Sequence, residues 1–233
     1  MLPDTLRRED GVYMLNRVLD GDCSAVVGVS NTGKSYLLRN LAARQVQQQI
    51  LGPAAGQYLF VYVDFNLMLE ATEQGFYELI LRCLMEELAR HDPEAEFLGS
   101  LPRSYETLVE PPSAFHISLS FSDGLTAVCQ GASKNLVLLF DEFDEPFVLI
   151  EGRAYLNLRA LKDKYRQRLG FVTATNRRLS NIRRGRDVDE FVELFEPFTR
   201  FLGPLSDTDV ATVVTSVAGQ EGYTFDDQDL KFL

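Results

Sequence analysis

An eight-residue stretch near the amino terminus constrains this chain more than any other feature: Gly28-Val29-Ser30-Asn31-Thr32-Gly33-Lys34-Ser35. It matches the pattern G-x-x-x-x-G-K-[ST] at every fixed position. A short apolar run at 24–29 precedes it and predicts a buried strand, and apolar residues at helical spacing follow it over 36–44. The pattern therefore lies between a strand and a helix, where a loop can wrap around a polyanion.

The residue types in this stretch suit a triphosphate. Glycines let the backbone turn tightly and bring its N–H groups close to phosphate oxygens, and the new helix adds its positive dipole end. We predict that Lys34 reaches the β- and γ-phosphates and that the Ser35 hydroxyl binds Mg²⁺. An ordinary glycine turn before a helix is the alternative, but it leaves the fit of both flanks unexplained. The residues predicted to contact the nucleotide are Gly28, Ser30, Asn31, Thr32, Gly33, Lys34, Ser35 and Tyr36.

A second signal is the segment Asn135–Glu142. Five consecutive apolar residues, 136–140, predict a strand that is covered on both faces. Asp141 and Glu142 follow at once. We expect Asp141 to hold Mg²⁺ through water, and Glu142 to orient and deprotonate an attacking water. The alternative is an acidic loop or a helix cap.

A third buried strand, predicted over 169–175, ends in Asn176. This side chain is a candidate for contact with the γ-phosphate or the lytic water, and a simple turn former is the alternative. The arginine-rich segment 177–187 comes next. Arg177, Arg178 and Arg183 are candidates for an arginine finger, with a solvated basic loop as the alternative for each.

The composition limits the possible fold size, location and partners of the chain. A chain of 233 residues, 45% of them hydrophobic, can build one large α/β core or a core with a small lid. No apolar run approaches the roughly 20 residues that span a bilayer, so we expect no membrane partner. Three widely spaced cysteines and an N-terminus without an apolar core predict a cytoplasmic protein. The net charge of −11 argues against wholesale nucleic-acid binding, yet ten of the 23 basic residues lie between Arg159 and Arg186.

Strand and helix patterns alternate along the chain. This alternation predicts a three-layer α/β/α fold around a mostly parallel five-stranded sheet. In the first predicted helix, Val12 and Tyr13 belong to the core or, as a similarity to P-loop ATPases implies, pack beside an adenine. The expected elements are a helix at 11–19, strand 24–29, helix 33–50, strand 58–63, helix 72–91, a surface excursion at 92–112, helix 113–132, strand 135–140, helix 153–168, strand 169–175, a basic loop at 177–187, helix 188–195, strand 197–202, helix 206–217 and the start of a helix at 224–233.

Over residues 10–218 these motifs resemble the AAA+ and related STAND ATPases, a branch of the P-loop NTPases with an added catalytic glutamate. In this resemblance 28–35 is the Walker A motif, Leu136–Glu142 is Walker B and Asn176 is sensor 1. Asn66 resembles the polar partner that restrains the glutamate in some members. The resemblance implies an ATPase core at 1–203 and the beginning of a helical lid at 204–233. No sensor 2 arginine or winged helix can be placed, so we expect the lid to be truncated.

The resemblance implies a Mg²⁺-dependent ATPase that works as a conformational switch or oligomeric motor and is slow in isolation. ATP is expected over GTP, and protein partners or self-association are favoured. One alternative is a nucleic-acid-associated ATPase that uses the basic loop Arg177–Arg186. Another is a nucleotide-binding scaffold without catalysis, and a metabolite kinase is a weaker possibility.

Overall fold

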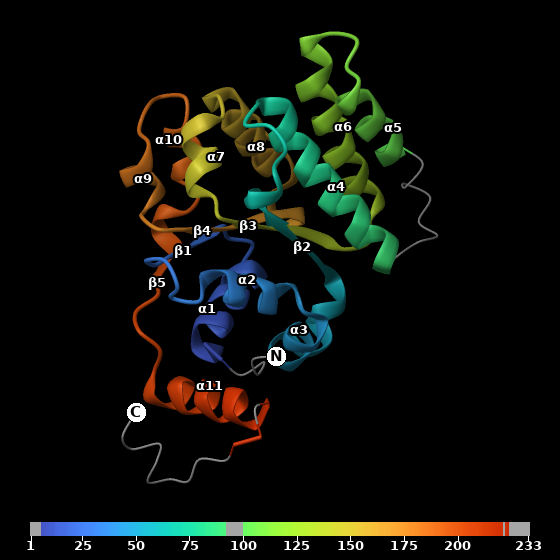
Figure 1. Ribbon diagram of the computed structural model, residues 1–233. Coiled ribbons are helices and arrows are strands. Elements are labelled where there is room, and N and C mark those ends of the chain that lie inside the picture. Colours follow the sequence, from blue (N-terminus) through green and yellow to red (C-terminus); the bar gives the residue numbers. More distant parts are fainter. Residues whose placement is uncertain (1–5, 92–99, 221, 224–233) are drawn as a thin grey trace.

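A five-stranded sheet lies between two layers of helices in the computed structural model, which describes residues 6–91, 100–220 and 222–223 (Figure 1). The strands are β1 (Ser24–Val27), β2 (Tyr58–Asp64), β3 (Asn135–Asp141), β4 (Leu169–Thr175) and β5 (Thr199–Phe201). The helices are α1 (Arg8–Leu19), α2 (Lys34–Ala42), α3 (Arg44–Leu51), α4 (Glu73–His91), α5 (Ser100–Val109), α6 (Ala114–Gly131), α7 (Asp144–Leu149), α8 (Gly152–Tyr165), α9 (Leu179–Ile182), α10 (Asp189–Val192) and α11 (Asp207–Gln220).

The strand order is β2-β3-β4-β1-β5, and every neighbouring pair is parallel. This confirms the predicted three-layer α/β/α fold of the P-loop NTPases. The carboxyl ends of parallel strands meet at one edge of a sheet, which is where such sheets bind ligands. Because β4 separates β1 from β3, the end of β4 lies between the glycine-rich loop after β1 and the acidic residues after β3.

Both faces of the sheet are buried, which explains the unbroken apolar runs in its strands. On β3, Leu136, Leu138 and Phe140 face the layer of α4, α6 and α8, whereas Val137 and Leu139 face α1 and α2 (Figure 1). The first face is rich in aromatic rings and the second in aliphatic side chains. The described part of the chain contains no helix that is both long and apolar enough to cross a membrane.

The structure corrects the single helix predicted over 33–50. The chain forms α2 and α3, because the backbone of Ala43 is extended, with φ −72° and ψ 120°. The buried Gln47 side chain donates to the carbonyls of Leu41 (2.8 Å) and Ala42 (3.0 Å). Two carbonyls left at the end of α2 are thereby satisfied, so the break costs little.

The surface excursion predicted over 92–112 was also wrong in part, because residues 100–109 form α5. Leu101 and Leu108, on one side of this helix, have fully buried side chains. Pro102 suggested a loop, but it lies in the first turn, where backbone N–H groups have no partner within the helix. The proline therefore does not interrupt the hydrogen-bond ladder.

Other predicted boundaries shift by a few residues. The basic segment includes the short helix α9, and the helix expected over 188–195 is limited to α10, residues 189–192. The helix predicted at 206–217 is α11, which lies below α1 and away from the sheet (Figure 1). The helix predicted at 224–233 falls outside the described residues.

Candidate nucleotide-binding site

Residues 28–33, called here the phosphate loop, connect β1 to α2 and need glycine at two positions. A Cβ on Gly28 would lie 2.6 Å from Thr32 Oγ1, so any larger residue would displace the loop. Gly33 has φ +90°, a left-handed conformation that L-residues avoid. Asn31 is also left-handed, with φ 66°, as this residue type tolerates. The loop thus keeps the shape that the sequence pattern predicts.

Lys34 begins α2, and only 6% of its surface is exposed. Its Nζ donates to the carbonyls of Gly28 (2.8 Å) and Val29 (3.2 Å) and to Oδ1 of Asn176 (3.0 Å). The ammonium group is therefore held inside the curve of the phosphate loop. Ser35 and Tyr36, in the same turn of α2, are half-buried.

Asn176 joins the phosphate loop to the acidic segment. Its backbone N–H donates to both carboxylate oxygens of Asp144 (3.0 and 2.9 Å), and its Nδ2 donates to Asp144 Oδ2 (3.2 Å). Burial raises the pKa of Asp144, while the Asn176 N–H and the charges of Lys34 and Arg177 oppose that rise. One amide side chain thus fixes the lysine and the carboxylate relative to each other.

Asp141 lies at the end of β3, beside Asp64 at the end of β2, and it is almost fully buried. Tyr62 Oη donates to Asp141 Oδ2 at 2.6 Å, and the backbone N–H of Glu142 donates to Oδ1 at 3.0 Å. Arg39 donates to Tyr62 Oη at 3.1 Å. Burial and the adjacent carboxylate raise the pKa of Tyr62, so the phenol stays protonated and keeps Asp141 in place.

Glu142 has φ +53°, a left-handed backbone that is unusual for this residue type. Such conformations cost about 1–3 kcal/mol and cluster at functional sites. Burial first, and then the charge of Asp141, raise the pKa of the Glu142 carboxyl. Among the described residues no hydrogen-bond donor contacts this carboxylate. Glu142 thus has an environment that favours proton uptake.

The residues predicted to hold Mg²⁺ have suitable chemistry. Mg²⁺ prefers oxygen ligands and is usually held by one or two carboxylates together with substrate phosphates and water. The Ser35 hydroxyl and the Asp141 carboxylate supply two such oxygens, one from the start of α2 and one from the end of β3. The hydrogen bonds from Tyr62 and Glu142 orient that carboxylate.

Asn66 follows β2 and is exposed, and its backbone N–H donates to Asp64 Oδ1 at 3.1 Å. No side-chain hydrogen bond between Asn66 and Glu142 occurs in the part of the chain that the structure describes.

The three arginines suggested as fingers have different surroundings. Arg183 points inward, donates to the carbonyl of Ile150 at 2.7 Å and pairs with Asp187. Arg178 lies over the ring of Phe201, with its guanidinium carbon 4.9 Å from the ring centre. Arg177 is exposed beside Asn176. The structure therefore engages Arg183 in internal contacts and leaves Arg177 facing solvent.

One hollow borders the phosphate loop directly, and a second is connected to the loop through Arg7. One, of about 370 Å³, lies between the loop and the ends of β4 and β5. The other, of about 560 Å³, lies between the start of α1 and the segment that leads from β5 into α11. Val12 and Tyr13 do not line it, and Tyr13 instead stacks with Arg200, 5.5 Å from the ring centre. The first turn of α1 thus borders the hollow.

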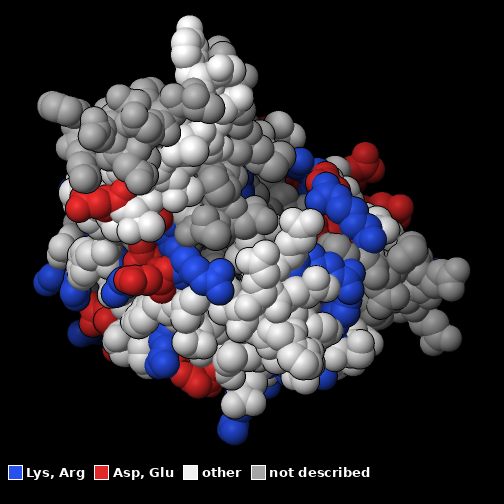
Figure 2. Space-filling model, turned by 90° about the horizontal axis from the view of Figure 1, so that it is seen from below, with Lys and Arg blue, Asp and Glu red and all other residues white. Residues whose placement is uncertain are grey.

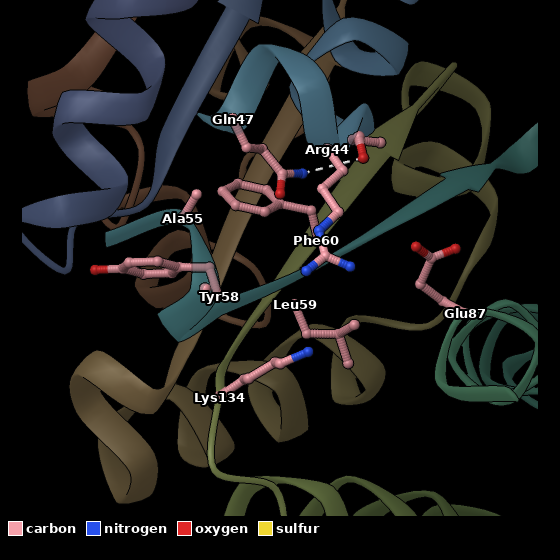
Figure 3. A pocket seen from close by; sticks show the side chains of 10 residues that line it. Arg44, Gln47, Ala55, Tyr58, Leu59, Phe60, Glu87 and Lys134 are labelled. Carbon is pink, nitrogen blue, oxygen red and sulfur yellow. Dashed lines mark hydrogen bonds between the residues drawn. The ribbon is translucent and has the colours of Figure 1, made fainter. Parts of the chain in front are cut away.

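A third pocket lies at the opposite, amino-terminal edge of the sheet (Figure 3). Arg44 and Lys134 extend toward its middle, and Tyr58 and Phe60 form a wall. Its volume of about 30 Å³ leaves no room for a nucleotide. The predicted site residues are at the other end of the strands.

Sequence reasoning missed Tyr62, Arg39 and Asp144. A signal for Asp144 was present, because it stands three residues after Asp141 and begins a helix next to the sheet edge. Tyr62 stands two residues before Asp64 and so shares its side of β2. No spacing rule connects Arg39 of α2 with either residue.

Comparisons with known proteins support the fold. No family model and no curated protein sequence matches this chain. Among solved structures, the ADP form of the ORC2 protein of Aeropyrum pernix is 17% identical, with a TM-score of 0.62, and 94% of this chain covers 54% of it. The ORC1 protein of the same organism in complex with DNA is 17% identical, with a TM-score of 0.58 and coverages of 94% and 51%. A Walker-type ATPase of Pyrococcus abyssi is 14% identical, with a TM-score of 0.56 and coverages of 97% and 62%.

The chain thus spans about half the length of the two Aeropyrum proteins. At these identities the likeness concerns the fold alone, the three-layer α/β/α fold of the P-loop NTPases.

Proposed function

We propose that this chain binds ATP with Mg²⁺ at the carboxyl edge of its sheet and hydrolyses it slowly, as a nucleotide-driven switch. One observation carries the proposal: Asn176 connects the buried Lys34 to the acidic segment that begins at Asp141. A cation, an amide and carboxylates from three separate strand ends converge there. The similarity to ORC2 in its ADP form supports a nucleotide as the ligand.

Lys34 supplies the charge for the terminal phosphates. Without nucleotide its Nζ bonds to carbonyls of the phosphate loop, so no unpaired cation is buried. Phosphate oxygens would replace those carbonyls as acceptors. Because charge-assisted hydrogen bonds to anions are stronger than those to neutral carbonyls, the exchange favours binding.

Glu142 is the proposed general base. Its raised pKa and unengaged carboxylate suit proton removal from a water that attacks the γ-phosphate. Asn176, held by Asp144, would orient that water or the γ-phosphate. Mg²⁺ held by Ser35 and Asp141 would neutralise charge on the phosphates. The isolated chain is expected to turn over slowly, because an arginine added to the site can contribute about 10³–10⁵ in rate. Arg177 is the exposed candidate for that role.

The hollow between α1 and the β5–α11 segment is the proposed place for the base and ribose. It opens next to Arg7, whose Nε bonds to the phosphate loop, and its volume of about 560 Å³ is within the range of ligand sites. The adenine contact that the sequence suggested for Val12 and Tyr13 is therefore better assigned to the first turn of α1.

Protein partners or self-association are favoured over nucleic acid. The face that carries α11 has acidic and basic side chains interspersed (Figure 2). The similarity to ORC1 in complex with DNA supports nucleic-acid binding as the alternative. Binding through exposed arginines at 177–186 would weaken steeply with salt. A flat titration with DNA and RNA at low salt would remove this alternative.

The test is phosphate release from ATP by the purified chain with Mg²⁺. We expect slow, reproducible turnover that Glu142→Gln abolishes while ATP binding remains. Binding without any release in the native chain would instead support the non-hydrolysing scaffold. Turnover that survives in Glu142→Gln would remove the assigned base.

A further inference from the structure

Arg7, directly before α1, is the most heavily engaged arginine near the site. It is 5% exposed, and its backbone is left-handed, with φ 55°. Its guanidinium donates to the carbonyl of Thr32 in the phosphate loop (2.9 Å) and to the carbonyl of Gly203 after β5 (2.6 Å). It also pairs with Asp10 at 3.2 Å. Three segments far apart in the sequence thus meet at one side chain.

The backbone of Arg7 reaches a fourth segment. Its N–H donates to Oδ1 of Asp209, in the first turn of α11, at 3.1 Å. Asp10 in turn accepts from Arg200 Nε at 2.7 Å. The buried charges are therefore paired, as burial requires. Arg7 touches the phosphate loop with its side chain and α11 with its main chain.

The remaining contacts of α11 are looser. Ala218 is buried, but the other described side chains along the helix are half-buried or exposed. The hollow of about 560 Å³ lies between this helix and α1. The position of α11 over that hollow therefore depends strongly on its first turn, where Asp209 meets Arg7.

We propose that Arg7 is a positioning residue that couples the state of the phosphate loop to the docking of α11, a role that rests on the proposed nucleotide binding. A Cβ at Gly33 would lie 3.4 Å from Arg7 Nε, so the loop and the guanidinium are in close contact. A shift of the loop around a bound triphosphate must therefore move Arg7 or strain its bond to Thr32. Either change is passed to Asp209 through the Arg7 backbone.

The test measures hydrogen–deuterium exchange of residues 207–220 with and without a nonhydrolysable ATP analogue and Mg²⁺. In the native chain we expect the analogue to slow exchange by at least about fivefold, the low end of usual coupling between sites. Asp209→Ala should reduce this factor toward one, measured at a saturating concentration of the analogue so that native and variant chains both carry it.

Two matched variants distinguish coupling from general damage to the helix. Asp209→Asn keeps an oxygen acceptor for the Arg7 N–H and should restore the nucleotide response. Asp207→Ala removes a carboxylate from the same helical turn without touching Arg7, and it should respond like the native chain. Both variants control for the loss of charge at the helix N-terminus.

The outcomes separate the two proposals. If the analogue does not bind the native chain, the proposed function fails. If it binds but exchange in 207–220 does not change, or if Asp209→Ala responds like the native chain, the coupling role of Arg7 is wrong. Arg7→Ala should also lose the response, and an unchanged response in a folded Arg7→Ala protein would overturn the proposal.

Discussion

One buried lysine and one run of arginines show how differently the fold uses positive charge. Lys34 sits inside the phosphate loop, contacts Asn176, and its charge acts on the carboxylates of Glu142 and Asp144. The segment 177–186 holds five arginines. Arg183 contacts carbonyls of the α7–α8 region, Arg184 donates to the carbonyl of Ser180 in α9, and Arg178 covers Phe201. Lys34 lies inside the predicted ligand site and Arg177 and Arg178 line the hollow beside it, whereas Arg183 and Arg184 stabilise local structure.

The number of positive charges in a segment therefore does not predict which of them lies in the ligand site. Lys34 lies close to Asn176 and the acidic residues because the end of β1 and the start of α2 fix the direction of its side chain. The arginines follow β4 on a segment that contains the short helix α9, where Arg183 and Arg184 donate to different backbone carbonyls. The site therefore depends on backbone geometry, and charge density contributes less.

The largest effect is expected from Lys34→Ala. It removes the ammonium group that lies within the curve of the phosphate loop, so affinity for ATP should fall at least a hundredfold, or about 2.7 kcal/mol. Titration with a fluorescent ATP analogue measures the loss. Arg178→Ala is the matched control and should bind within a few fold of the native chain. Equal losses in the two variants would break the contrast between lysine and arginines.

Asn176→Ala should reduce the rate of hydrolysis by about a hundredfold, as the loss of one donor at a developing charge typically does. Binding should change much less, because Lys34 remains. Single-turnover phosphate release and the binding titration together measure this split. Asn181→Ala is the control. Asn181 is exposed and lines the same hollow of about 370 Å³ as Asn176, and its substitution should hardly change the rate of hydrolysis. A loss confined to binding would contradict the role given to Asn176.

Arg183→Ala should destabilise the fold by about 1–2 kcal/mol, because it leaves buried carbonyls without a charged donor. Arg177→Ala should change the free energy of unfolding by less than about 0.5 kcal/mol. Urea unfolding of both variants measures the difference. Similar stability in the two variants would show that the internal contacts of Arg183 contribute little.

The smallest effect concerns Glu142 and pH. Its pKa is raised in the folded state, so the folded chain binds its proton more tightly than the unfolded chain does. The stability that this proton contributes is present at acidic pH and is lost as pH rises through the folded pKa. Glu142→Gln should therefore melt slightly above the native chain at pH 7, and this gap should close near pH 4. Thermal melts across that range test the sign, and a native chain that melts higher at pH 7 would contradict it.

Much of the fold was predictable because buried parallel strands and nucleotide loops have local signatures. The strands predicted over 24–29, 135–140 and 169–175 are present, although β1 ends at Val27 and β3 at Asp141, and their order places Asn176 between Lys34 and the acidic residues. The break at Ala43 was not predictable, because it depends on a side chain, Gln47, that caps carbonyls of the preceding helix. Helix α5 was hidden by Pro102, whose harmless place in the first turn only the structure reveals.

The supporting residues of the site were less accessible from sequence. Tyr62 reaches Asp141 because β2 and β3 pair in one register, and Arg7 reaches Asp209 across 202 positions. Pairing register and long-range packing follow from the whole chain and carry no local motif. The left-handed backbone of Glu142 is likewise invisible in its residue type. The roles of the predicted site residues stay predictions until binding and turnover are measured.

We propose that the loop 28–33 and the acidic segment at the end of β3 together bind a nucleoside triphosphate. Isothermal titration calorimetry of the native chain with ATP and Mg²⁺ tests it most directly. We expect saturable heat that fits one ATP bound per chain. No heat with ATP, GTP, CTP or UTP in the presence of Mg²⁺, from a protein that is shown to be folded, would contradict it.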